Sequence, residues 1–438
     1  MEEKKIIKGF SKLSKEEKIK RIASFCTNPK EIEKELKSFW HPEIAKQKIF
    51  DEFAENTISN FYFPYGIMPN VIINGKNYMI PMVIEESSVV AAASNSAKFW
   101  STRGGFHTRI ISTNKIGQVH FIWSGNFAKL EKHFHIIKKL FFEGTHSITK
   151  NMQDRGGGIL DIELVDMRHE INDYYQLKAS FNTVDSMGAN FINSCLEEFA
   201  DILKRYVAHE KELNQNDIQI IMSILSNYTP DCIVEAWVEC DIKDLEGVDA
   251  DITAEDFAWK FEKAVQVATV DTSRATTHNK GIFNGVDAVV LATGNDFRAV
   301  EACGHTFASR DGKYKSLTTI DLKDDKFKYA LKIPLALGTV GGLTKLHPLA
   351  KFTMELLGDP HANDLMQIAA VAGLANNFGA LRSLTTKGIQ KGHMKMHLLN
   401  ILNNFAASET EKQAAVEYFK NKKVSFSAVA DFVKDIRL

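Results

Sequence analysis

The chain has 438 residues, 44% of them hydrophobic and 25% charged, which is typical of a globular protein of two or three domains. Its 54 lysines and arginines balance 55 aspartates and glutamates, which excludes the basic excess that nucleic-acid binding requires. The five dispersed cysteines, the polar start MEEKKIIKGF and the lack of an apolar stretch near the ~18 residues of a membrane helix predict a cytoplasmic protein.

The first part of the chain predicts helices, then a hairpin. Ser14 begins a capping box, and Asn28-Pro29 marks a second helix start. Two β-rich runs within 70–84 are separated by Asn74-Gly75, the strongest short signal for a hairpin. The second run ends at Glu85-Glu86, where we expect a strand to pass into a helix.

Residues 109–227 predict a small α+β domain of ferredoxin-like type, inserted into a larger one. We expect a hairpin, a helix, two strands, a long helix and a last strand, in that order. These elements are Arg109–Ser112 with Val119–Ser124, Phe127–Phe142, Ile159–Asp166, Tyr174–Thr183, Ala189–Leu213 and Ile218–Leu225.

The larger domain resumes at about residue 228. We expect one short buried strand, Ala288–Thr293, among helices at Glu255–Thr269, Leu343–Leu357 and Leu365–Ala375. The segment from Glu411 to Leu438 predicts two short helices joined by a strand-like stretch at Val424–Phe426.

The turn Asp185–Asn190 lies between a predicted strand and a predicted long helix. A helix N-terminus offers unpaired N–H groups and partial positive charge to a pyrophosphate, and Gly188 would let a phosphate approach the backbone. A plain structural turn explains the same residues. The turn Gly338–Gly342 has the same two interpretations.

The segment Thr277–Arg298 carries two polar, glycine-containing turns on either side of the apolar run VDAVVLAT. If that run is a strand, Lys280 and Asp296 could meet at one place. A lysine beside an aspartate stays charged and can donate to a developing oxyanion. The alternative is an ordinary salt bridge.

Two further side chains are candidate proton donors. Glu86 could be a carboxylic acid kept protonated by burial, and His393 could titrate near neutrality, although a lone histidine is often structural. The sequence has no H-E-x-x-H motif and no carboxylate cluster with ligand spacing, so we predict no metal.

Seven motifs together resemble one family, the class II (bacterial-type) 3-hydroxy-3-methylglutaryl-CoA reductases. They follow the family's order from Glu55 to His397: ENTI, VIEESSVVAAAS, DSMGAN, THNKGIFNG, TGNDFRAVEA, GTVGG with TKLHP, and GIQKGHM. The resemblance implies a large α+β domain (1–108 and 228–378), a small cofactor-binding domain (109–227) and a mobile C-terminal flap (379–438). It also implies reduction of hydroxymethylglutaryl-CoA through bound mevaldehyde to mevalonate and CoA, with two hydrides.

The resemblance also implies residue roles. Lys280 would steady the thioester oxygen, Asp296 would lie between it and the catalytic Glu86, and His393 would protonate the departing thiolate. The matching substrate contacts are Ser88, Asn227, Arg274 and Asn284, and the matching dinucleotide-binding turn supplies Asp185, Met187, Gly188 and Asn190. A homodimer with sites built from both subunits is implied as well.

Two positions depart from the family pattern. Ser59 replaces a usual glycine after ENTI. Thr149, followed by Lys150, stands where an NADH-preferring relative has an aspartate; these residues favour the 2′-phosphate of NADPH, with NADH as the alternative. The alternative functions are the reverse, mevalonate-oxidising direction, and a catalytically silent CoA-binding protein, which should have lost Glu86, Lys280, Asp296 or His393.

Overall fold

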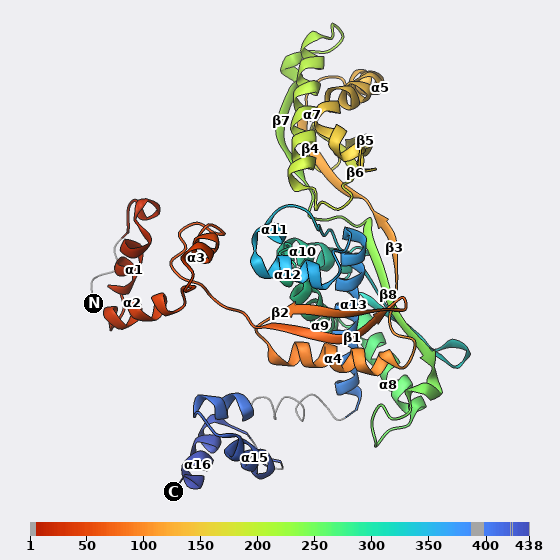
Figure 1. Cartoon of the computed structure of the whole chain (residues 1–438). Helices are drawn as coiled ribbons and strands as arrows, with labels where there is room; N and C mark the ends of the chain where they lie inside the picture. Colours follow the sequence, from red (N-terminus) through yellow and green to blue (C-terminus); the bar gives the residue numbers. More distant parts are fainter. Residues whose placement is uncertain (1–5, 387–397, 421, 423, 438) are drawn as a thin grey trace.

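The computed structural model describes residues 6–386, 398–420, 422 and 424–437. Figure 1 shows a large central domain from which a small domain projects. The chain begins with α1 (Lys15–Ala23), α2 (Pro29–Ser38) and α3 (Ile44–Asp51). The predicted capping box is confirmed, because Ser14 accepts a hydrogen bond from the backbone of Glu17 while the Glu17 carboxylate accepts one from the backbone of Ser14.

The predicted hairpin is also confirmed. It pairs β1 (Tyr65–Ile73) with β2 (Lys76–Val83), and both turn residues, Asn74 and Gly75, have positive φ as a type I′ turn requires. The chain then enters α4 (Ser87–Ser101), which contacts β1. Glu86 is therefore the N-cap residue of a helix that follows a strand.

The small domain has the predicted ferredoxin-like arrangement. Its antiparallel sheet has the order β5-β6-β4-β7, and one hydrophobic core joins the sheet to α5 and α7. The elements are β4 (Lys115–Trp123), α5 (Phe127–Gly144), α6 (His146–Gln153), β5 (Gly158–Asp166), β6 (Tyr174–Asn182), α7 (Ala189–His209) and β7 (Ile218–Leu225). A Cβ on Gly117 would lie 2.6 Å from Leu196 Cδ1, so this glycine lets α7 approach β4 closely.

The predicted hairpin at the start of this domain is wrong. β3 (His107–Thr113) pairs with β8 (Cys232–Asp241) of the large domain, whereas β4 pairs with β6 and β7 of the small domain. Consecutive strands thus belong to different sheets, with a single residue, Asn114, between them. The chain passes from one domain to the other at this point (Figure 1).

The large domain is built around the sheet β3-β8-β10-β9, which we did not predict. Its further elements are β8 (Cys232–Asp241), α8 (Ala254–Val270), α9 (Thr272–Ala292), α10 (Phe297–Ala308), β9 (Thr318–Asp321), β10 (Lys326–Pro334), α11 (Leu343–Leu346), α12 (Pro348–Leu356) and α13 (Ala362–Thr385). The signal for β8 was present: from Val234 to Asp241 buried and more exposed residues alternate, as on a strand with one covered face.

The predicted strand at Ala288–Thr293 is wrong as well, because the apolar run forms the end of helix α9. The glycines that suggested turns are packing positions. A Cβ on Gly285 would lie 2.2 Å from the carbonyl oxygen of Ala372, and one on Gly373 would lie 2.7 Å from Val286 Cγ2. A helix buried this closely against α13 is apolar on several faces, so its apolar residues do not recur with the 3.6-residue period that would have indicated a helix.

The C-terminal residues form α15 (Glu409–Tyr418) and α16 (Phe426–Ile436), which confirms the two predicted helices. The strand-like stretch at Val424–Phe426 is not a strand, since Ser425 caps the helix that begins at Phe426. These helices share a hydrophobic core with residues 398–407. The long helix α13 continues to Thr385, past residue 379 where we expected the flap to begin.

Candidate active site

Glu86 and Lys280, 194 residues apart in sequence, meet at the start of α4. The Lys280 Nζ lies 3.4 Å from Glu86 Oε2, and the Ser88 hydroxyl donates to Glu86 Oε1 at 2.7 Å. The Lys280 side chain remains 63% exposed and the Glu86 side chain 40%. The carboxylate is therefore oriented from two sides, while the ammonium group keeps donors available for a ligand.

Asp296 does not join this pair within one chain. It is the N-cap residue of α10, where its Oδ1 accepts from the backbone of Arg298 and its Oδ2 lies 2.9 Å from the Arg298 guanidinium. Lys280 is twelve residues from the last residue of α9, Ala292, which is ~18 Å along a helix axis. The two residues that a strand would have brought together are therefore separated by the second half of α9, with Lys280 near the middle of the helix and Asp296 beyond its end.

The surroundings of Asp296 form a groove of about 620 Å³ between the N-terminal segment and the ends of α9 and α12. It is lined by Thr57 of the first motif and the adjacent Ser59, and by Asp296 and Arg298 of the TGNDFRAVEA motif. Aromatic side chains such as Phe61 complete the lining. The first and fifth motifs thus contribute to this groove, which neither Lys280 nor Glu86 lines.

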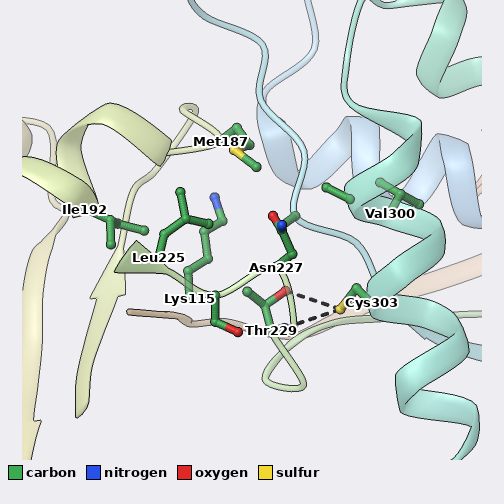
Figure 2. A pocket seen from close by; sticks show the side chains of 11 residues that line it. Lys115, Met187, Ile192, Leu225, Asn227, Thr229, Val300 and Cys303 are labelled. Carbon is green, nitrogen blue, oxygen red and sulfur yellow. Dashed lines mark hydrogen bonds between the residues drawn. The ribbon is translucent and has the colours of Figure 1, made fainter. Parts of the chain in front are cut away.

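The residues predicted to contact substrate lie around Lys280 and at the domain junction. Asn284 is one helical turn beyond Lys280 on α9 and so projects from the same side. Arg274 lies nearer the start of α9, and burial lowers its pKa. Asn227 follows β7 and lines the junction between the domains (Figure 2).

The predicted dinucleotide-binding turn leads into α7, whose N-cap is Gly188. Gly188 has φ +94°, and a Cβ there would lie 2.5 Å from Thr183 Cγ2, so only glycine fits. No side chain caps the helix, which leaves N–H groups of its first turn open to an anion. The local structure therefore fits a bound pyrophosphate.

Asp185, in the same turn, is anchored to the large domain. Its Oδ1 accepts from the backbone of Ala362 at 2.8 Å, and its Oδ2 lies 2.9 Å from His361 Nδ1. Burial alone would raise the pKa of Asp185, but these two partners hold it below its ordinary value. Gly338 packs against the same turn, because a Cβ there would lie 2.5 Å from Met187 N.

The two residues predicted to recognise the 2′-phosphate differ in accessibility. Both are on α6, where Thr149 is 1% exposed and its hydroxyl faces the carbonyl of His146, whereas Lys150 is exposed. Lys150 is thus the one that can reach a ligand in this arrangement.

Two predicted residues remain. The predicted catalytic residue His393 lies outside the described residues. Asn190 is exposed in the first turn of α7.

Sequence reasoning missed Lys115 and His361, which hold the dinucleotide turn from the small and the large domain. A signal existed for Lys115, since it stands in register with the buried positions of β4. Nothing in the sequence pairs His361 with Asp185, 176 residues away. Within the described residues no cluster of His, Cys, Asp and Glu suits a metal, and no helix has the length and apolar character to cross a membrane.

A small domain whose long helix begins with open N–H groups, together with a lysine–carboxylate pair in the large domain, is the arrangement expected of a dinucleotide-dependent oxidoreductase. The family model described as hydroxymethylglutaryl-coenzyme A reductase matches residues 15–398. The chain is 36% identical over 417 residues to the 3-hydroxy-3-methylglutaryl-coenzyme A reductase of Archaeoglobus fulgidus, covering 94% of this chain and 90% of the relative. It therefore belongs to the hydroxymethylglutaryl-coenzyme A reductase family.

Solved structures from Streptococcus pneumoniae are similar to this chain. A 3-hydroxy-3-methylglutaryl-coenzyme A reductase has a TM-score of 0.71 and 32% identity, covering 98% of this chain and 99% of that one. A class II enzyme bound to NADPH in open conformations has a TM-score of 0.70 and 33% identity, covering 86% and 99%. The enzyme class and the mixed fold expected from the sequence are thus confirmed.

Proposed function

We propose that this protein reduces 3-hydroxy-3-methylglutaryl-CoA to mevalonate and free CoA, using two equivalents of NADPH, at a site centred on Lys280 and Glu86. The observation that carries the proposal is the contact between these two side chains, with Ser88 orienting the carboxylate. The cofactor supplies a hydride in each of the two steps. The protein must therefore stabilise an oxyanion twice and deliver protons to sulfur and to oxygen.

The Lys280 ammonium serves as the oxyanion stabiliser. As hydride reaches the thioester carbon, negative charge develops on the carbonyl oxygen, and a preplaced ammonium lowers that barrier. The carbon–sulfur bond then breaks, and the proposed donor of the proton to the CoA thiolate is His393. The second hydride converts the aldehyde to an alcohol, whose oxygen takes its proton from Glu86; for this step Glu86 must be in its carboxylic acid form, held by Ser88. Arg274, Asn284 and Asn227 would bind the hydroxymethylglutaryl portion.

The position of Asp296 supports a homodimer with shared sites. A two-fold axis that places two α9 helices antiparallel would bring the end of one helix to the middle region of the other. The partner subunit's Asp296 would then approach Lys280 and Glu86, which Asp296 of the same chain cannot do across the length of α9. The proposed active unit is therefore a dimer with two equivalent composite sites.

The proposed cofactor-binding site lies at the N-terminus of α7. Gly188 allows a close approach of phosphate, the open first turn offers N–H donors that include that of Asn190, and Asp185 and Met187 are held by the large domain. Lys150 would attract the 2′-phosphate of NADPH. The similar class II enzyme of Streptococcus pneumoniae, which is described as bound to NADPH, supports this choice. Five free cysteines favour a reducing compartment, so we propose the cytoplasm.

The test is spectrophotometric. Oxidation of NADPH is followed with hydroxymethylglutaryl-CoA for the unmodified protein, for Lys280→Ala and for Lys260→Ala, an exposed lysine on α8 that serves as the control. Loss of one oxyanion stabiliser should lower kcat by about 10²–10³. Lys260→Ala should retain full activity. Absence of turnover in the unmodified protein, or full activity of Lys280→Ala, contradicts the proposal.

A further inference from the structure

Lys115 is a buried lysine at the junction between the two domains. It is the first residue of β4 and is 4% exposed. Its side chain lies on the face of the strand whose other residues pack into the hydrophobic core of the small domain. Figure 2 shows its side chain between Met187, Leu225 and Asn227, beside Thr229 and Cys303 of the adjoining segments. Burying an ammonium group is costly unless a compensating interaction exists.

The two hydrogen-bond acceptors of Lys115 lie in residues 183–188, the segment that leads through the dinucleotide-binding turn into α7. Its Nζ donates to Thr183 Oγ1 at 2.6 Å and to the carbonyl oxygen of Ser186 at 2.8 Å, and the Thr183 hydroxyl also contacts that carbonyl. These acceptors are neutral. Among the described residues no carboxylate forms an ion pair with Lys115, and burial lowers its pKa, although Cys232 and Asp185 act in the opposite direction. Lys115 is thus held at this position by hydrogen bonds to neutral acceptors.

The Ser186–Met187 peptide is fixed from both sides. Lys115 binds its carbonyl oxygen, and on the amide side Gly338 packs so closely that a Cβ would lie 2.5 Å from Met187 N. Gly338 is itself anchored, since its N–H donates to Asn295 Oδ1 at 2.8 Å. Because the peptide is planar, holding its oxygen and its nitrogen sets the direction in which the chain enters Gly188 and α7.

The cavity beside Lys115 is too small for a cofactor. Its volume is about 10 Å³, room for no more than one water molecule. A ligand at the start of α7 therefore meets the turn rather than the Lys115 ammonium itself. The lysine therefore acts on such a ligand indirectly, by keeping the turn in one conformation.

We propose that Lys115 is a positioning residue for the cofactor, which locks the 183–188 turn in the conformation that receives the dinucleotide phosphates. This inference rests on the proposed function, in which the start of α7 holds NADPH. It assigns a role to a buried side chain outside the motifs, and it predicts that Lys115 affects cofactor binding much more than substrate binding.

The experiment compares the unmodified protein with Lys115→Met, Lys115→Arg and Thr183→Val. The matched control is Lys178→Met, which removes an exposed lysine from β6 of the same sheet. NADPH dissociation constants are measured by calorimetry without hydroxymethylglutaryl-CoA, and KM for both substrates and kcat are measured separately. Thermal unfolding of each variant reports on folding.

Lys115→Met should weaken NADPH binding about tenfold or more, because it removes the two hydrogen bonds that hold the turn. KM for hydroxymethylglutaryl-CoA should stay within about twofold of the unmodified value. Lys115→Arg should recover part of the loss by restoring N–H donors to the turn, and Lys178→Met should have no effect. Thr183→Val keeps the ammonium but removes one of its partners, so it should give a smaller loss.

An unchanged NADPH dissociation constant in a folded Lys115→Met protein overturns the inference. If that variant does not fold, Thr183→Val decides, and unaltered binding there overturns it equally. An equal rise in both KM values would indicate a general structural role and would also contradict it. If the unmodified protein neither binds NADPH nor turns over substrate, the proposed function itself fails, and the two failures are thereby distinguished.

Discussion

A shared active site predicts that two inactive variants restore activity when they are mixed. Lys280→Ala removes the oxyanion stabiliser, and Asp296→Asn removes the carboxylate at the far end of α9. Each variant alone should lose activity, by about 10²–10³ for the lysine change. In a mixed dimer, one site combines both changes, whereas the other combines an intact Lys280 with an intact Asp296 from the opposite subunit.

The expected recovery follows from counting sites. If subunits reassociate at random, half of the molecules are mixed dimers, and each has one intact site of two, so activity should reach about a quarter of the unmodified level. The structural basis is the ~18 Å of helix between Lys280 and the end of α9, which keeps the two residues apart within one chain. A site contained in one chain would predict no recovery at any mixing ratio.

The assay needs subunit exchange before activity is measured. The two purified variants are mixed, dissociated by mild denaturant and reassociated, and NADPH oxidation is then followed with hydroxymethylglutaryl-CoA. Each variant treated alone is the control for the procedure. Size-exclusion chromatography of differently tagged subunits confirms that mixed dimers have formed. Mixed dimers without activity would refute the shared site.

The other predictions concern packing, pH and cofactor choice. Gly285→Ala places a Cβ 2.2 Å from a backbone oxygen of α13, so it should lower the unfolding free energy by about 1–3 kcal/mol. Gly281→Ala should lower it less, because the nearest atom to its Cβ is a side-chain nitrogen at 3.3 Å. Equal unfolding curves for the two variants would contradict this. The hydrogen bond to Asp185 raises the pKa of His361 from 6.5, so its stabilisation is complete below that pH and is lost as pH rises through the raised value. His361→Ala should therefore lower Tm in mildly acidic buffer and have little effect in alkaline buffer; a pH-independent difference would argue against the pair. Lys150→Glu should lower the ratio of kcat/KM for NADPH to that for NADH about tenfold or more by repelling the 2′-phosphate, and an unchanged ratio would exclude that contact.

Local signals predicted the elements whose causes are local. The capping box at Ser14, the Asn74-Gly75 hairpin and the small domain are set by neighbouring residues and by the alternation of apolar positions, and all appear in the structure. The errors arose where a pattern depended on distant partners. The run VDAVVLAT has a strand-like composition only because α13 covers several faces of α9, through contacts at Gly285 and Gly373 that sequence spacing does not reveal.

By itself, the sequence determined the family, the ferredoxin-like insertion and the residue types of the site, because ordered motifs and hydrophobic periods are properties of the chain alone. Only the tertiary structure decided which of these residues meet. It joined Lys280 to Glu86, placed Asp296 beyond the end of α9, and turned Lys115 and His361 toward the dinucleotide turn. The physical reason is that contacts between residues far apart in sequence depend on how helices and sheets pack. That packing depends on the fit of all the core side chains together, which no local stretch of sequence contains.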